Sequence, residues 1–448
     1  MIHMHVASRL HRHPARSCGV AILATGVMVM PLAAPSPGAR EQELSRPVTS
    51  SPGPRAALSA VAERVSISSS GRQTRGDVGT RTRVSSNGRF VAFSSESLSL
   101  VRGDTNREED VFVRDRLTGT TTRVSVNGRG GELAHGGRLA DMTPDGRYVL
   151  FNSSLPRMFN RVWLYDRFSD AATKIRGAST FFGAAGAGAT ALSADARFIA
   201  FFTEDDLGPR DRGHGFSASA YVYDRERRTV RLMSIDNHNR DLGDAYAHDI
   251  SAGGRLVAFS TRFPSKIFVR DRVLHVTRHI SLSRTGRHQR RAFSWDASVS
   301  NQGRFLAFMS TASNLVRGDT NDKADVFVRD RLKRRTFLVS VSKGGGPARG
   351  DSGDPSISGD GRYVVFSSRA ANLVPHDRND TADVFVRLLR DSRTRVVSSG
   401  RDGRPSVARS VEGAVSASGD FASFVTRSPL APNDTNRAMD AYVTARPN

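Results

Sequence analysis

A short motif that returns seven times is the feature that most constrains how this 448-residue chain can fold. Its fullest copy runs from Ser358 to Ser368 and reads Ser-Gly-Asp-Gly-Arg-Tyr-Val-Val-Phe-Ser-Ser. One phenylalanine recurs in every copy, at intervals of 49 to 58 residues: Phe93, Phe151, Phe201, Phe259, Phe308, Phe366 and Phe424. A repeat of this length is the size of one propeller blade, so seven copies predict seven similar units in one ring.

Each copy of the motif predicts a β-hairpin. An apolar residue and a Ser or Thr precede a turn, which is clearest at Asp145-Gly146 and Asp360-Gly361. Asp-Gly tolerates the positive φ of a tight turn. The run behind the turn, such as residues 147–151, is aromatic and β-branched with almost no polar interruption. A strand with this composition is expected to be covered on both faces, as between stacked sheets.

Two more strands are expected in each repeat. Third strands are predicted at 111–115, 162–166, 221–224, 267–271, 326–330, 384–386 and 441–443. Fourth strands are predicted at 123–126, 230–233, 279–282, 338–341 and 395–398. The last copy stops after its third strand, and residues 64–68 carry a matching strand sequence before the first repeat. The fold class predicted is therefore all-β, a seven-bladed β-propeller with four antiparallel strands per blade, whose last blade is closed by the N-terminal strand.

Residues 63–448 are assigned to this single propeller, and the residues before it to export. Residues 1–39 have the pattern of a signal peptide: three arginines, then an apolar stretch from Gly19 to Ala34. An uncleaved membrane anchor is the alternative. Residues 40–62, rich in proline and serine, are expected to be a flexible linker. The one cysteine, Cys18, lies in the signal, so the mature chain would contain no disulfide.

The formal net charge is +22, which makes nucleic acid the first partner to consider. Residues 1–40 contain four arginines and no acid, so the remainder still carries +18. The arginines recur at fixed places, after the hairpin turn and after the third strand, which spreads them around the ring. We therefore interpret them as a solvated surface and expect no specific nucleic acid. Attraction to an acidic envelope polymer remains an alternative.

The motif, followed downstream by Asp-Val-Phe-Val-Arg-Asp-Arg, resembles the propeller repeats of TolB-like proteins, and the resemblance covers essentially all of residues 63–448. It implies an exported bacterial β-propeller that acts as a docking surface. This sequence has seven copies where TolB has six, and it has no α/β domain before the propeller. No family catalytic residue matches, so none is transferred.

A recurring acidic loop between the second and third strands is a candidate Ca²⁺ site. It has an Asp at position 1, an Asn at position 3 and an Asp at position 7, which are hard oxygen ligands of the kind Ca²⁺ prefers. The alternative is that these residues make local turns that hold the loop. The candidate metal ligands are Asp104, Asn106, Asp110, Asp319, Asn321, Asp325, Asp377, Asn379, Asp383, Asp434, Asn436 and Asp440.

The second candidate site is the central funnel, where the innermost strands of a propeller meet. Polar residues just before the recurring Ser or Thr are expected to line it: Arg83, Asp141, His248, Asp249 and Asp296. The adjacent His and Asp allow an acid–base interpretation, and structural hydrogen bonds at strand ends are the alternative. We assign no catalytic residue from the sequence.

The sequence favours a scaffold rather than an enzyme, although it does not settle the question. We expect a secreted, periplasmic or envelope-associated monomer, without an obligatory cofactor, that binds another envelope protein. One alternative is a Ca²⁺-dependent module for cell-wall or extracellular glycan. The other is a polysaccharide hydrolase or lyase that uses carboxylates in the funnel.

Overall fold

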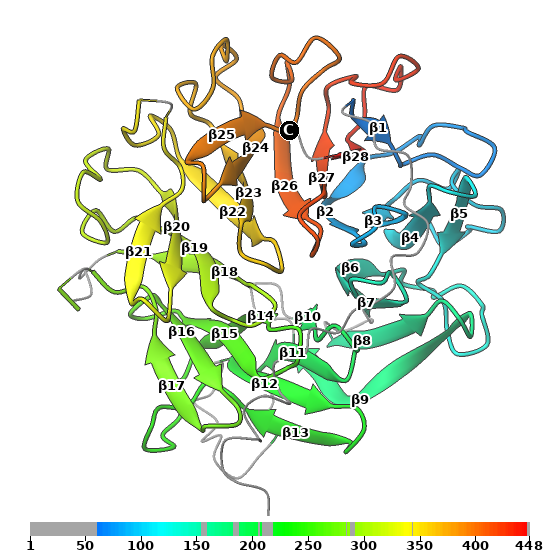
Figure 1. Ribbon diagram of the computed structural model, residues 1–448. Coiled ribbons are helices and arrows are strands. Elements are labelled where there is room, and N and C mark those ends of the chain that lie inside the picture. Colours follow the sequence, from blue (N-terminus) through cyan, green and yellow to red (C-terminus); the bar gives the residue numbers. More distant parts are fainter. Residues whose placement is uncertain are drawn as a thin grey trace, which may run out of the picture. The chain divides into compact units, whose positions relative to one another are not determined.

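The computed structural model describes residues 61–153, 159–181, 188–204, 207, 218–283, 285–286, 292–342 and 344–445. All of them belong to the unit formed by residues 52–448. They form seven antiparallel sheets of four strands each, arranged as the blades of a propeller (Figure 1). The predicted fold class is confirmed. The predicted signal peptide and almost all of the predicted linker lie outside the described residues. No helix that could span a membrane occurs in the described ranges.

The blades are numbered here in chain order. Blade 1 contains β2 (Val78–Val84), β3 (Phe90–Ser95), β4 (Asp110–Asp115) and β5 (Thr120–Arg123). Blade 2 contains β6 (Arg138–Met142), β7 (Tyr148–Ser153), β8 (Phe159–Asp166) and β9 (Ala171–Phe181). Blade 3 contains β10 (Ala189–Leu192), β11 (Phe198–Thr203), β12 (Ser219–Asp224) and β13 (Thr229–Leu232). Blade 4 contains β14 (Ala245–Ile250), β15 (Leu256–Thr261), β16 (Lys266–Asp271) and β17 (Val276–His279).

Blades 5 to 7 follow the same order. Blade 5 contains β18 (Ser294–Val299), β19 (Phe305–Ser310), β20 (Asp325–Asp330) and β21 (Arg335–Leu338). Blade 6 contains β22 (Ser352–Ile357), β23 (Tyr363–Ser368), β24 (Asp383–Leu388) and β25 (Arg393–Val396). Blade 7 contains β26 (Ser410–Val415), β27 (Phe421–Thr426), β28 (Asp440–Ala445) and the N-terminal β1 (Glu63–Arg64).

The recurring phenylalanine is the centre of each blade. It is fully buried in all seven copies, and its ring packs against that of the aromatic residue opposite it on the third strand, stacked in six blades and tilted in blade 6. In blade 1 the ring centroids of Phe93 and Phe112 are 5.9 Å apart, and the other six pairs lie between 5.5 and 6.3 Å. The second strands are buried on both faces, as their continuous apolar sequences predict.

The core is divided among the seven interfaces between neighbouring blades. Each interface has its own cluster of buried apolar side chains, including one between blade 7 and blade 1. The innermost strands contact one another in the order β2, β6, β10, β14, β18, β22, β26 and back to β2. The ring is therefore closed by packing as well as by hydrogen bonds.

The N-terminal strand completes blade 7, as predicted. Glu63 and Arg64 pair with Val443 and Tyr442 on β28, and the Val65 amide donates to the Ala441 carbonyl at 2.9 Å. This contact joins residues that are more than 370 positions apart in the chain.

The fourth strands begin and end a few residues earlier than the sequence predicted. In blade 1 the strand ends at Arg123, and one further backbone bond, from the Val124 amide to the Val111 carbonyl at 2.8 Å, follows before a side chain takes over. The Ser125 hydroxyl accepts the Val111 amide at 3.0 Å and also donates to Asp110. Serines at the same place in blades 5, 6 and 7 accept the third-strand amide in the same way, at 3.0 to 3.1 Å.

Candidate functional site: the central channel

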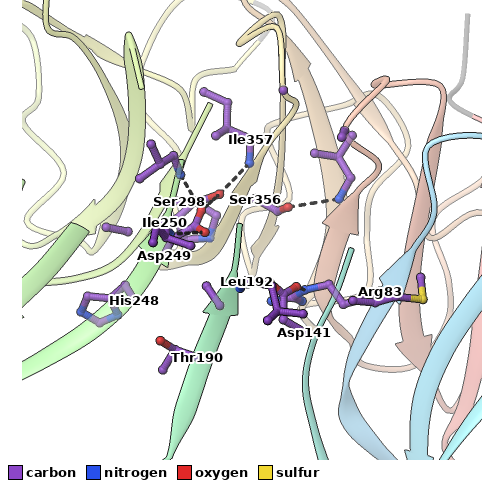
Figure 2. Close-up of a pocket in the computed structure, with 18 of the residues that line it drawn as sticks. Arg83, Asp141, Thr190, Leu192, His248, Asp249, Ile250, Ser298, Ser356 and Ile357 are labelled. Carbon is purple, nitrogen blue, oxygen red and sulfur yellow. Dashed lines mark hydrogen bonds and ion pairs between the residues drawn. The ribbon is translucent and has the colours of Figure 1, made fainter. Parts of the chain in front are cut away.

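All seven innermost strands line one cavity of about 330 Å³ at the centre of the ring (Figure 2). Around one end of it, backbone amides of one hairpin turn donate to the carbonyl of the next turn. The Ala252 carbonyl accepts the Ala194 amide at 2.9 Å, and the Ala252 amide donates to the Asn301 carbonyl at 3.1 Å. Three further bonds of this kind bring the number of linked pairs of adjacent blades to five among the described residues. The channel wall is therefore tied together by main-chain bonds.

A β-bulge interrupts the pairing of every innermost strand with its neighbour. A bulge bends the strand and redirects a side chain. The residues in the bulges include Arg81, Ala140, Thr190, His248, Asp296, Asp354 and Glu412. All of these except Ala140 line the cavity.

Three acidic bulge residues in blades 5, 6 and 7 adopt a left-handed backbone. Asp296, Asp354 and Glu412 have φ values of 47°, 50° and 48°. Such values are uncommon for residues other than glycine, and they tend to occur at functional sites. The sequence prediction included Asp296 but missed the other two.

Burial and mutual repulsion raise the pKa values of these acids. The pKa of Asp296 is raised to about 7, first by burial and then by Asp354 and Glu412, against the attraction of Arg81. The pKa of Asp354 is raised by burial and then by Glu412. Burial, and then Arg83, lowers the pKa of Arg81, whose Nη1 donates to the Ala140 carbonyl at 3.2 Å.

The predicted funnel residues Arg83 and Asp141 lie in the channel and bind each other. Arg83 Nε donates to Asp141 Oδ1 at 2.8 Å. The other carboxylate oxygen of Asp141 accepts the Leu192 amide of blade 3, also at 2.8 Å. The pair therefore links three consecutive blades (Figure 2).

Asp249 has a similar structural role in blades 4 and 5. Its Oδ1 accepts the Ile250 amide and its Oδ2 accepts the Val299 amide, both at 2.7 Å. Burial nevertheless raises its pKa to about 7, against these two hydrogen bonds. Serines continue the pattern: Ser298 accepts the Ile357 amide at 3.2 Å in the next blade.

His248 and Asp249 have separate partners. The His248 Nε2 lies 2.8 Å from the Ser260 hydroxyl. The His248 and Trp295 rings are nearly perpendicular, with their centroids 5.2 Å apart. Burial, and then Arg81, lowers the His248 pKa to about 3, so the imidazole is neutral near pH 7. The geometry gives this histidine a packing role beside the channel.

The predicted Asp/Asn loops lie between the second and third strands of blades 1, 5, 6 and 7. In blade 1, Asn106 Nδ2 donates to Asp110 Oδ2 at 2.9 Å, and its Oδ1 accepts the Glu108 amide at 2.9 Å. Asn321 and Asn379 make the equivalent bonds. In blade 7, Asn436 donates to Thr74 and its Oδ1 accepts the Ala438 amide. The asparagines therefore hold the loops, and the aspartates remain as possible ion ligands.

Ligand atoms of Asp104, Asp110 and Glu132 in blade 1 lie within 4.8 Å of one another. Glu132 was missed from the sequence because it lies after the fourth strand. Burial and then Asp110 raise the pKa of Asp104 to about 6, and burial and then Asp325 raise that of Asp319 to about 6. In blade 1 Arg123 opposes this effect, with its Nη1 2.5 Å from Glu132 Oε1.

The recurring arginines bind acids and aromatic rings of the propeller itself. Arg89 Nε and Nη2 bind the two oxygens of Asp115 at 2.9 and 2.7 Å. The arginine after the turn pairs with the aspartate that ends the third strand in blades 2 to 5 as well. Arginines after the third strand stack on the neighbouring blade, as Arg167 does on Phe90 at 3.6 Å. Much of the positive charge therefore has a structural role.

Comparison with known proteins identifies relatives at the level of architecture. No protein-family model matches the sequence. No curated protein matches it either. Solved structures similar to it include TolB from Acinetobacter baumannii, at 14% identity and a TM-score of 0.40 over 64% of this chain and 58% of that one. The match thus spans little more than half of that protein.

Two further structures show the range of these similarities. A putative TolB from Agrobacterium tumefaciens is 17% identical, with a TM-score of 0.42 over 72% of this chain and 97% of that one. A prolyl endopeptidase is 13% identical, with a TM-score of 0.49 over 83% and 50%. TolB proteins thus occur among the similar structures. TM-scores below 0.5 assign neither an activity nor a partner.

Proposed function

We propose that this protein is an exported binding scaffold whose channel takes a positively charged group from a protein partner in the cell envelope. The proposal rests on the negative sign of the formal charge that lines the channel. Its charged lining comprises five acids and two arginines: Asp141, Asp249, Asp296, Asp354, Glu412, Arg81 and Arg83. An acidic cavity in a chain of net charge +22 selects cations and repels acidic polymers.

The cavity has the size for this role. Binding cavities for small ligands begin at about 300 Å³, and this one is near that limit. One lysine or arginine side chain from a loop or terminus of another protein fits such a volume. Proteins present these side chains on their surfaces, so we infer a protein partner with an exposed basic segment.

The hydrogen bonds favour binding over catalysis. Both oxygens of Asp141 and both oxygens of Asp249 accept bonds from the propeller itself. A general acid or base must reach the substrate, which groups fixed in this way do less readily. Among the bulge acids, Asp354 accepts bonds from the Ser367 hydroxyl and the Glu412 amide, whereas the pKa of Asp296 is shifted by burial and by neighbouring charges alone.

A basic peptide tests the proposal. The full-length protein is titrated calorimetrically with a short lysine peptide and, as a matched control, with the same peptide acetylated on its lysines. We expect only the charged peptide to bind. The Asp354→Asn/Glu412→Gln double variant should lose at least tenfold in affinity, with the fold checked by circular dichroism. Equal binding of both peptides, or no loss in the variant, would contradict a cationic ligand.

The partner itself is sought by pull-down from an envelope extract with the wild type and the same double variant. A protein captured by the wild type and lost from the variant supports the proposal. Capture of polysaccharide by both would favour the glycan-binding alternative.

A second candidate function is a polysaccharide hydrolase or lyase, favoured by one observation. Asp296 has a pKa of about 7 beside Asp354 and Glu412, which is suitable for proton transfer at neutral pH. Reducing-end release from a panel of polysaccharides, with Asp296→Asn as the comparison, tests it. Turnover that survives this substitution would exclude Asp296 from the mechanism.

A further inference from the structure

The first aspartate of each acidic loop faces a guanidinium in blades 1 and 7. Arg123 at the end of β5 and Arg64 at the end of β1 lie opposite the third-strand aromatic residue. Arg123 Nη1 is 3.6 Å from Asp104 Oδ1, and Arg64 Nη1 is 3.1 Å from Asp434 Oδ1. In these two blades a positive charge supplied by the chain therefore compensates the buried carboxylate.

Blades 5 and 6 have the same loop without that positive charge. The residues equivalent to the two arginines are Leu338, which pairs with Phe327, and Val396, which pairs with Phe385. The first loop aspartates, Asp319 and Asp377, are only 7% and 9% exposed. Oδ1 of each has no hydrogen-bond partner among the described residues. The charged neighbours of Asp319 are Asp325 and Asp322, and those of Asp377 are Asp383 and Asp380. All four are acids, so they repel the negative charge of the first aspartate.

Each of these carboxylates accepts one backbone amide of its own loop, from Asn321 or Asn379, but an unpartnered buried oxygen that carries charge remains costly because it loses its hydration without compensation. Three things relieve that cost: a guanidinium, a proton or a metal ion. Each of these loops places a second, fully buried aspartate near the first, Asp325 in blade 5 and Asp383 in blade 6. Carboxylate oxygens, completed by carbonyls and water, are the ligands of Ca²⁺.

We propose that residues 319–325 and 377–383 each bind a Ca²⁺ ion through the first and last aspartate of the loop. The ion takes the place that a guanidinium occupies in blades 1 and 7. The negative charge of the buried first aspartate is thus compensated by an arginine of the chain in blades 1 and 7, and by a bound cation in blades 5 and 6. The sites lie in the loops of blades 5 and 6, whereas the proposed binding function uses the central channel.

Calcium titration of the full-length protein after chelator treatment tests the proposal directly. By calorimetry with CaCl₂ we expect two equivalents of Ca²⁺ to bind. The melting temperature should rise with saturating Ca²⁺ and fall again on addition of chelator, because an ion that binds only the folded state stabilises it. No binding heat together with an unchanged melting temperature would overturn the proposal.

Substitutions that place an arginine beside the proposed ion in blades 5 and 6 give a sharper test. Leu338→Arg and Val396→Arg should each remove one equivalent of bound Ca²⁺. The double variant should bind no Ca²⁺, and its melting temperature should not change when chelator is added. Leu232→Arg, at the same strand position in blade 3, is the matched control and should keep both equivalents. Undiminished binding in the double variant would contradict the proposed position of the ions.

The reverse exchange predicts a gain of binding. Arg123→Leu leaves Asp104, Asp110 and Glu132, whose ligand atoms lie within 4.8 Å, without their guanidinium. We expect a third equivalent of Ca²⁺. Asp319→Asn/Asp377→Asn distinguishes an ion from a proton, because it should abolish the Ca²⁺ response of the wild-type loops. If the wild type binds no Ca²⁺ and this variant melts at the same or a higher temperature, the carboxyls are protonated and the proposal fails.

Discussion

At the scale of single residues, Asp296 combines burial, repulsion and an unusual backbone. Its pKa of about 7 in the folded protein exceeds the usual aspartate value of 3.8, so the folded chain holds this proton more tightly than the unfolded chain does. The free energy of unfolding therefore falls as the pH rises from about 4 to about 7, and this loss is complete at higher pH. The charged Asp296 carboxylate therefore lowers the free energy of unfolding at pH 8. At pH 4 the group is protonated in the folded protein and lowers it little.

Asp296→Asn should remove that cost. The amide is neutral at every pH and tolerates the left-handed backbone at φ 47°. We expect the variant to be more stable than the wild type at pH 8, by on the order of 2 kcal/mol after allowance for the solvated channel. The gain should vanish near pH 4. Urea unfolding at both pH values measures it. Asp391→Asn, at an exposed aspartate outside the channel and the acidic loops, is the control and should show no such pH dependence.

At the scale of elements, the hairpin turn does more than reverse the chain. Gly361 has φ 72°, as the Asp-Gly sequence predicts. A Cβ on this glycine would also lie 2.3 Å from Phe305 Cδ2 in the neighbouring blade. The turns of blades 1, 2, 4, 5 and 7 make the same close approach to the blade beside them. The turn glycine therefore serves blade packing as well as local geometry.

Gly361→Ala should lower the free energy of unfolding by about 1–3 kcal/mol, through backbone strain and the clash with Phe305. Gly403→Ala separates the two causes, because Gly403 has φ 71° but no atom within 4 Å of its added Cβ. Urea unfolding of both variants measures the difference. Equal losses would show that the contact between blades contributes nothing.

The elements also show which features the sequence can predict. The repeated turn and the continuous apolar strand are local features, so the hairpins and the seven blades were predicted correctly. The bulges were not, because they depend on how many residues an innermost strand inserts against its neighbour. Asp296 lies three residues before its apolar anchor Val299, whereas His248 lies two before Ile250. Asp354 and Glu412 also lie three residues before their anchors, Ile357 and Val415, so this spacing was a signal that could have identified them.

The roles of the arginines were hidden for a related reason. Arg89 recurs visibly, but its partner Asp115 is 26 residues away and becomes its neighbour only through the pairing of Phe90 with Asp115. The sequence therefore predicted a solvated basic surface where the structure contains a set of ion pairs. Such contacts depend on the register between neighbouring strands, which cannot be read directly from the sequence.

At the scale of the whole molecule, closure of the ring depends on a few N-terminal residues. Val65 is fully buried in the core between blades 7 and 1, and its amide donates to Ala441. Ser66 adds a hydroxyl that accepts the Ala441 amide at 3.1 Å. Without these contacts the outer edge of β28 would be open to pairing with another chain. The stability of the ring and its state of association are therefore linked.

Val65→Pro tests this link, because proline has no amide to donate and does not fit within a strand ladder. We expect a loss of about 3 kcal/mol or more in the free energy of unfolding, with association that grows with protein concentration in size-exclusion chromatography. Val65→Ala keeps the amide and loses only part of the packing, so it should be destabilised less and remain monomeric. If the two variants unfold alike and neither associates, the hydrogen bond to Ala441 does not close the ring, and side-chain packing between blades 7 and 1 alone must hold it.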